Sequence, residues 1–136
     1  MSSENCLITH RPDLATLVAR WQDDAPVPAL QADFQHLLTT SEAYGTTRWL
    51  LDVRRRAQLN PELGAWTTTD FYPRAAAVLA PPMLRIAVLC SPARLAVYGS
   101  SAEQMDQLAF GMNPARPYRL QLFGDEGAAM NWLLTQ

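Results

Sequence analysis

The amino-terminal third of the chain changes from a hydrophobic period of two residues to a helical period. Residues 6–10 form a short strand-like run, and Arg11-Pro12-Asp13 is a turn-forming sequence. Over residues 14–21 the positions alternate between two faces, one of which carries Ala15, Leu17, Ala19 and Trp21. This alternation is typical of a strand, so the chain is predicted to open with a β-hairpin.

An amphipathic helix is predicted next, between Pro28 and Gly45. Proline is tolerated in the first turn of a helix because its missing N–H has no partner there, and glycine readily adopts the left-handed conformation that ends a helix. One side of the segment carries, at helical spacing, Leu30, Phe34, Leu37, Leu38 and Ser41. Asp33 and His36 take the other side, which is expected to face water.

Three further strands are predicted downstream. Residues 48–53 include the apolar run Trp49-Leu50-Leu51, and residues 84–91 are almost continuously apolar. Such runs are typical of central strands that are covered on both faces. Residues 118–123 alternate and form the last strand, after which Asp125 is placed to cap a final helix.

The segment between the first two of these strands predicts an irregular helix. Asn60-Pro61 provides an N-cap residue followed by proline at the first helical position. Within residues 62–80, the three threonines 67–69 lower the helix propensity, and Pro73 removes a backbone hydrogen bond. One bent helix, or two short helices that meet near Asp70, is therefore expected.

A further helix is predicted to begin at a capping-box sequence in residues 100–103 and to run to about Phe110, while Pro92 is expected to end the preceding strand. The element order is then β-β-α-β-α-β-α-β-α. Alternating strands and helices favour a largely parallel sheet with right-handed crossovers. The 136 residues are predicted to form one α/β domain, 1–136, with a mixed sheet that includes the initial hairpin.

Composition narrows the functional class. Thirteen acidic and eleven basic residues, all of the latter arginine, give a formal net charge of −2, whereas nucleic-acid-binding domains carry a basic excess. The two cysteines, Cys6 and Cys90, lie in apolar runs without metal-ligand spacing, as buried reduced thiols of a cytosolic protein do. The first residues do not resemble a signal peptide, and no apolar stretch approaches the roughly 20 residues that span a bilayer, so a cytoplasmic protein is expected.

Three motifs follow one another in the second part of the chain. Leu51-Asp52-Val53 ends one strand, Ile86-Ala87-Val88 lies in the next, and the closing segment contains Phe123, Asp125, Ala129, Trp132 and Leu133. Together with the element order, these motifs resemble the SpoIIAA-like branch of the STAS superfamily, a group of small bacterial STAS/SEC14-like domains. The resemblance covers the chain from about Arg48 to its end.

The resemblance implies a non-enzymatic domain with a four- or five-stranded mixed sheet and no cofactor. It also implies a homodimer that acts through a regulatory protein partner or by binding a small apolar or lipid-like ligand. The phosphorylation switch of anti-sigma-factor antagonists needs a serine or threonine in the loop after the Asp-bearing strand. This chain has Arg54-Arg55-Arg56-Ala57 there and no hydroxyl group before Thr67, so the switch is not carried over.

Arg54, Arg55 and Arg56 form a candidate anion-binding site. They follow a strand at the edge of the sheet where open α/β proteins usually bind ligands. The amino terminus of the next helix adds partial positive charge and free N–H groups, as phosphate and carboxylate sites do. In the alternative, the three side chains point in different directions, pair with nearby acids such as Asp52 and stay solvated.

Asp52 is the main candidate for catalysis. An unpaired carboxylate inside a buried strand would be costly, so an arginine side chain or backbone N–H groups are expected to hold it. The catalytic alternative is a small enzyme that uses Asp52 with an arginine and His10 or His36, although no partner acid or nucleophile is identifiable beside it. Neither histidine has neighbours at metal-ligand spacing, and no metal site is predicted.

Three aromatic residues, Trp66, Tyr72 and Tyr98, are candidates for lining an apolar pocket, with core packing as the alternative. A ligand is expected to enter between the second helix and residues 92–110, beside the Arg54–Arg56 loop. The sequence therefore favours a non-catalytic regulatory or ligand-binding module whose partner is an apolar or anionic small ligand or a regulatory protein. Anion binding through the triple arginine and an enzyme centred on Asp52 remain as alternatives.

Overall fold

A five-stranded mixed sheet forms the centre of the molecule. The computed structural model describes residues 4–58 and 60–135, without the side chains of residues 103, 104 and 107. The strands follow one another across the sheet in chain order: β1 (Cys6–Arg11), β2 (Thr16–Trp21), β3 (Arg48–Asp52), β4 (Arg85–Leu89) and β5 (Arg119–Phe123). β1 is antiparallel to β2, and the other pairs are parallel. The predicted α/β class is confirmed.

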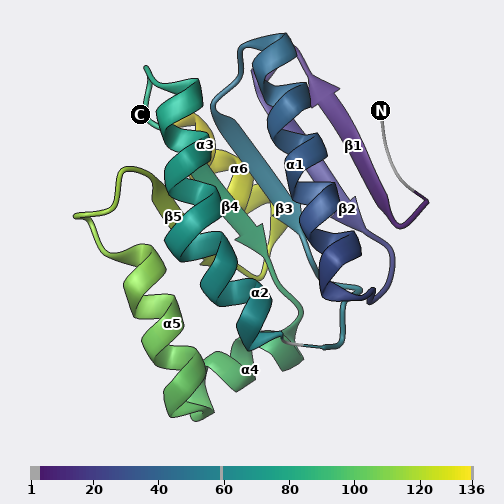
Figure 1. Ribbon diagram of the computed structural model, residues 1–136, viewed down its shortest axis with the longest axis vertical. Coiled ribbons are helices and arrows are strands. Elements are labelled where there is room, and N and C mark those ends of the chain that lie inside the picture. The colour runs from purple at the N-terminus through teal and green to yellow at the C-terminus, as the bar shows by residue number, and fades with distance from the viewer. Residues whose placement is uncertain (1–3, 59, 136) are drawn as a thin grey trace.

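The helices cover the two faces unequally. They are α1 (Val27–Tyr44), α2 (Pro61–Trp66), the π-helical turn η1 (Thr67–Phe71), α3 (Tyr72–Leu79), α4 (Pro92–Ser100), α5 (Ala102–Met112) and α6 (Glu126–Leu134). Because right-handed crossovers between sequential parallel strands return on one side, α1, α2–η1–α3 and α5 lie side by side on one face. α6 lies on the opposite face (Figure 1).

Each face of the sheet has its own apolar cluster. The larger cluster lies under α1 and α2–η1–α3 and is centred on the fully buried side chains of Trp21, Trp49 and Phe71. The smaller one lies under α6, where Ala129 and Leu133 pack against Leu50. β3 and β4 therefore bury residues on both faces, as their apolar runs predict.

The hairpin and first helix agree with the sequence prediction in most respects. Gly45 ends α1 with a φ of 67°, and the five predicted inward residues of this helix are buried. Asp33 is an exception: it was expected to face water, but it is buried and its carboxylate accepts a hydrogen bond from Trp21 Nε1 at 3.0 Å. The hydrogen bond provided by the indole makes this burial tolerable.

The irregular second helix is continuous rather than broken near Asp70. The π-helical turn at residues 67–71 takes up the irregularity, and the Tyr72 N–H donates to Thr67 O. Pro73 follows directly, so the wider turn lies where the ring of proline would otherwise crowd an α-helix. The hydroxyl groups of Thr67 and Thr68 each donate to Gly64 O at 2.9 Å.

The sequence analysis missed α4. Pro92 was expected only to end a strand, but it occupies the first turn of this helix. Ser91 caps the helix, since its hydroxyl accepts a hydrogen bond from the Arg94 N–H at 3.1 Å. The Ser-Pro sequence was the available signal. The omission matters because α4 carries Arg94 and Tyr98 to the end of the sheet.

The closing segments match their predicted positions. α5 begins at Ala102, where a helix start was expected, and the Asp125 carboxylate caps α6 by accepting from the Ala128 N–H at 2.8 Å. Within residues 4–58 and 60–135, no helix is both long and apolar enough to cross a membrane.

Candidate functional site

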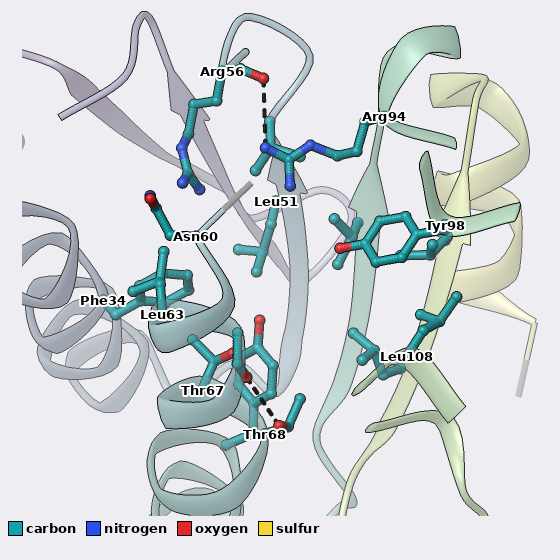
Figure 2. Close-up of a pocket in the computed structure, with 16 residues that line it drawn as sticks. Phe34, Leu51, Arg56, Asn60, Leu63, Thr67, Thr68, Arg94, Tyr98 and Leu108 are labelled. Carbon is teal, nitrogen blue, oxygen red and sulfur yellow. Dashed lines mark hydrogen bonds between the residues drawn. The ribbon is translucent and has the colours of Figure 1, made fainter. Parts of the chain in front are cut away.

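A cavity of about 100 Å³ lies at the carboxyl end of the parallel strands, under α2, α4 and α5. Six aliphatic side chains from the strands and helices form much of its wall: Leu51, Leu63, Val88, Leu108, Leu120 and Leu122. Figure 2 shows the arginines at one end of the cavity and Thr67 and Thr68 at the other. The cavity lies between the second helix and residues 92–110, where the sequence analysis placed ligand entry.

Arg56 is the first polar group of this cavity. Its side chain lines the wall although the residue is only 5% exposed. The loop after β3 is fixed by the hydrogen bond from the Arg56 N–H to Val53 O at 3.1 Å, which turns the side chain inward. Within the described part of the chain its guanidinium has no hydrogen-bond or ion-pair partner, and Nε is fully buried.

Arg94 is the second buried guanidinium, 9% exposed, and extends toward Arg56 from α4. One terminal nitrogen, Nη2, donates to Arg56 O at 3.4 Å and to Gln58 O at 3.2 Å. This bridge ties the loop after β3 to α4 (Figure 2). Arg94 Nε has no hydrogen-bond partner among the described residues.

Uncharged polar groups complete the wall. Asn60 precedes α2 but makes no side-chain cap, and its amide faces the cavity below Arg56 (Figure 2). The Tyr98 hydroxyl points into the same space from α4. Burial raises the pKa of Tyr98 although the Arg94 charge opposes the shift, and burial also raises the pKa of Tyr72. Both phenols are therefore neutral hydrogen-bonding groups near neutral pH.

No carboxylate lines the cavity among the described residues. Burial, together with the charge of Arg94, lowers the pKa of Arg56, while the carboxylate of Asp24 opposes this shift. Asp24 is held outside the wall by the N–H groups of Ala57 and Gln58, at 3.2 and 3.0 Å. The cavity thus combines an apolar wall with two buried positive charges that have no direct acidic partner in the described part of the chain.

Three arginines elsewhere provide a contrast. Arg48, Arg85 and Arg119 lie in register at the amino ends of β3, β4 and β5. Each donates to a backbone carbonyl, and Arg85 binds Trp132 O at 2.7 Å while its guanidinium stacks on the Trp132 ring at 4.2 Å. Their guanidinium groups have structural partners, whereas that of Arg56 has none in the described chain.

Asp52 and Arg54 belong to an ion-pair network on the α6 face. Asp52 Oδ2 lies 2.8 Å from Arg20 Nη1 and 2.9 Å from Arg54 Nη2. Its other oxygen accepts from the backbone and Nε of Arg54, and Arg20 also forms a two-point contact with Glu126 at 2.9 and 3.0 Å. Asp52 is therefore held by arginine side chains and a backbone N–H, as the sequence analysis expected.

This network does not provide a general base. Burial by itself would raise the pKa of Asp52, but the hydrogen bonds from Arg54 and Arg20 reverse that effect and keep the pKa below its ordinary value. Neither imidazole is among its contacts in the described chain: His10 stacks on Tyr44 with ring centroids 3.8 Å apart, and His36 lies on α1. The geometry required for an enzyme centred on Asp52 is not found among these residues.

The structure brings together three of the six candidate site residues of the sequence analysis and places the other three elsewhere. Arg56, Tyr72 and Tyr98 line the cavity. Arg55 is exposed and donates to Gln22 Oε1. Trp66 packs into the larger apolar cluster, where it stacks on Phe71 with ring centroids 5.1 Å apart, and it does not line the cavity.

Arg94 and Asn60 are two polar residues of the cavity wall that the sequence analysis did not propose as site residues. Arg94 was overlooked because α4 itself was missed, and the Ser-Pro capping sequence two residues before it was the usable signal. Asn60 was assigned to helix capping, which its side chain does not perform. A single sequence does not show whether Asn60 caps the helix or lines a cavity, because an asparagine side chain suits both roles.

The cysteines are core residues, as expected. Burial raises the pKa of the Cys6 thiol to about 12 and that of the Cys90 thiol to about 11, so both are protonated and unreactive at neutral pH. In the part of the chain that the structure describes, no three His, Cys, Asp or Glu side chains are grouped as metal ligands would be.

Comparison with known proteins adds no relative: no family model, curated protein or solved structure matches this chain.

Proposed function

We propose that this protein is a non-catalytic binding module of the SpoIIAA/STAS-like type, and that the cavity between Arg56 and Arg94 is its ligand site. The observation that carries the proposal is a partly apolar cavity, at the carboxyl edge of a parallel sheet, with two buried guanidinium groups in its wall. Open α/β sheets bind ligands at this edge. A ligand of small-molecule size is favoured over a regulatory protein because the space is small and recessed.

The SpoIIAA-like assignment is supported by the element order, whereas the three arginines are a departure from the family pattern. The opening hairpin, the strand ending in Asp52 and the five-stranded mixed sheet agree with what that resemblance implies. Arginine replaces the phosphorylatable residue after the Asp-bearing strand, and one of the three arginines, Arg56, lines the cavity. The proposal therefore assigns ligand binding, rather than phosphorylation, to this loop.

A non-catalytic role is supported by the chemistry of the cavity wall. Arg56 and Arg94 are cations, and Tyr98 and Tyr72 are phenols with raised pKa values. Neither type of group abstracts a proton readily at neutral pH, and no activated nucleophile is placed beside a base in this wall. These groups can bind and orient a ligand.

Native mass spectrometry of the protein purified from its own source tests the proposal. We expect a small molecule that remains bound in the native spectrum and is released on denaturation. Leu108→Trp should prevent its retention by filling the cavity from α5, whereas Met105→Trp, on the same helix and 49% exposed in the native chain, should retain it. Chemical conversion of the released molecule by the pure protein would contradict the non-catalytic role.

The same spectra measure the oligomeric state. A homodimer and a cytoplasmic location remain predictions of the proposal. The dimer is implied by the SpoIIAA-like resemblance, and the cytoplasmic location is supported by two buried thiols that are not in a disulfide.

A further inference from the structure

We infer that the ligand of the Arg56–Arg94 cavity is a small organic monoanion, a carboxylate with a short apolar body. This inference rests on the proposed function, since it specifies the chemistry of the same site. It goes further because it predicts that the charge of the ligand, and not its apolar surface alone, determines affinity.

The two buried guanidinium charges are poorly compensated within the described chain. Removing a guanidinium from water is costly unless an acid or several acceptors replace the water. Arg94 has two backbone carbonyls, but the Arg56 guanidinium has no partner in the described chain. A carboxylate between the two groups would accept charge-assisted hydrogen bonds from the terminal nitrogens of Arg56, whose side chain lines the cavity.

The number of charges around the cavity bears on the charge of the ligand. Two arginines face the cavity, and the nearby carboxylate of Asp24 acts on Arg56 in the opposite sense. Because the N–H groups of Ala57 and Gln58 fix Asp24 in place, its charge stays near the site. The carboxylate of Asp24 therefore offsets part of the positive charge beside the cavity, which favours a monoanion over a doubly charged phosphate.

Polar and apolar groups line different parts of the cavity. Figure 2 shows the guanidinium groups of Arg56 and Arg94, with Asn60 and the Tyr98 hydroxyl, around one end. Aliphatic side chains, among them Leu51 and Leu108, line the space between these groups and the two threonines at the other end. The hydroxyl groups of Thr67 and Thr68 donate to Gly64 O within their own helix. An anionic head would be bound at the first end, and an apolar body would lie against the aliphatic side chains.

The volume limits the length of the body. Apolar cavities of about 150 Å³ in proteins accept a molecule the size of benzene. The cavity here is smaller, about 100 Å³, and is open on one side. A body of a few carbon atoms fits this space, whereas a long acyl chain would have to extend into solvent.

Isothermal titration calorimetry with matched probes tests the inference. Pentanoate and pentanamide have the same shape but differ in charge. We expect the wild-type protein to bind pentanoate at least about tenfold more tightly than pentanamide, as charge-assisted hydrogen bonds to a buried arginine would give. Acetate, which lacks the apolar body, and inorganic phosphate should both bind more weakly than pentanoate.

Substitutions of single arginines test which side chains cause the preference for the charged probe. Arg56→Gln and Arg94→Gln should each weaken pentanoate binding about tenfold or more and leave pentanamide binding little changed. Arg55→Gln is the matched control, because Arg55 is adjacent in sequence but exposed and bonded to Gln22, and it should bind pentanoate as the wild type does. Circular dichroism melting curves would show whether each variant is folded at the titration temperature.

The outcomes separate this inference from the proposed function. Equal affinity of wild-type protein for pentanoate and pentanamide would overturn the anion while leaving a binding module, and this comparison needs no variant. Tighter binding of phosphate than of pentanoate would overturn the carboxylate. No binding of any of these probes would overturn the inference, whereas a neutral molecule retained in native mass spectra would still support the proposed function.

Discussion

The three consecutive arginines after β3 have three different environments. Arg54 pairs with Asp52 on the α6 face, Arg55 contacts Gln22 at the surface, and Arg56 turns into the cavity on the opposite side of the sheet. Side chains of consecutive residues point in different directions in an extended or turning chain. Of the three neighbouring side chains, Arg54 therefore has a structural role, Arg55 lies at the surface and Arg56 is available to a ligand.

The Asp52 network provides a prediction about stability. Asp52→Asn should lower the free energy of unfolding at pH 7 by about 1.5–3 kcal/mol, because it removes the charge from hydrogen bonds to Arg20 and Arg54 at a side chain that is only 10% exposed. Urea denaturation measures this difference. Asp13→Asn is the control, because Asp13 and its partner Arg11 are both exposed, and it should change stability much less.

The same variant should show a specific pH dependence. The pKa of Asp52 is lowered in the folded state, so its stabilising contribution is present above its unfolded pKa of about 3.9 and is lost as the pH falls through the lower folded pKa. The wild type and Asp52→Asn should therefore approach equal stability in acid. A difference that stays constant from pH 7 to below pH 3 would contradict the role assigned to the network.

At the scale of elements, substitution of glycine by alanine is expected to have opposite effects on stability at two positions, Gly111 and Gly99. A Cβ at Gly111 would lie 2.9 Å from Thr68 Cγ2 and 3.0 Å from Leu120 Cδ2, so Gly111→Ala should force α5 away from η1 and β5. Gly99, on α4, has no atom within 4 Å of such a Cβ, and alanine is the better helix former. Thermal unfolding should show that Gly111→Ala lowers the free energy of unfolding by about 1–3 kcal/mol. Gly99→Ala should raise it by about 0.5–1 kcal/mol.

The elements were largely predictable because their hydrophobic periods and end signals agree. Gly45 and Asp125 end and begin helices where the sequence analysis placed those boundaries. The π-helical turn at 67–71 was not predictable, because threonine hydroxyl bonds and the position of Pro73 can be accommodated by several helical geometries. Where neighbouring residues favour different backbone geometries, tertiary contacts decide which geometry the segment adopts.

The candidate site was predictable in position but only partly in composition. Strand ends and the arginine-rich loop indicated the edge of the sheet at which the cavity lies, since parallel strands direct their carboxyl ends to one side. The sequence does not show that Arg56, rather than Arg54, faces the cavity, because this depends on how the loop turns after Asp52. Arg94 reaches the same cavity from 38 residues further along the chain, which is a tertiary property.

At the scale of the whole molecule, the sheet separates the candidate ligand site from a second apolar cluster. Leu133 of α6 is fully buried against Leu50 on one face, while Leu63 of α2 is buried in the cavity wall on the other. Leu133→Ala and Leu63→Ala each remove the same atoms from a packed site. Each should lower the free energy of unfolding by about 2–5 kcal/mol.

Only one of these variants should change ligand affinity. Leu63→Ala enlarges the cavity, so its pentanoate affinity should change, whereas Leu133→Ala acts across the sheet and should bind pentanoate as the wild type does at a temperature where both are folded. Denaturation curves and calorimetric titrations of the same samples measure the two quantities. An equal loss of affinity in both variants would mean that binding follows global stability, and the ligand site would then not be confined to the face that carries Arg56 and Arg94.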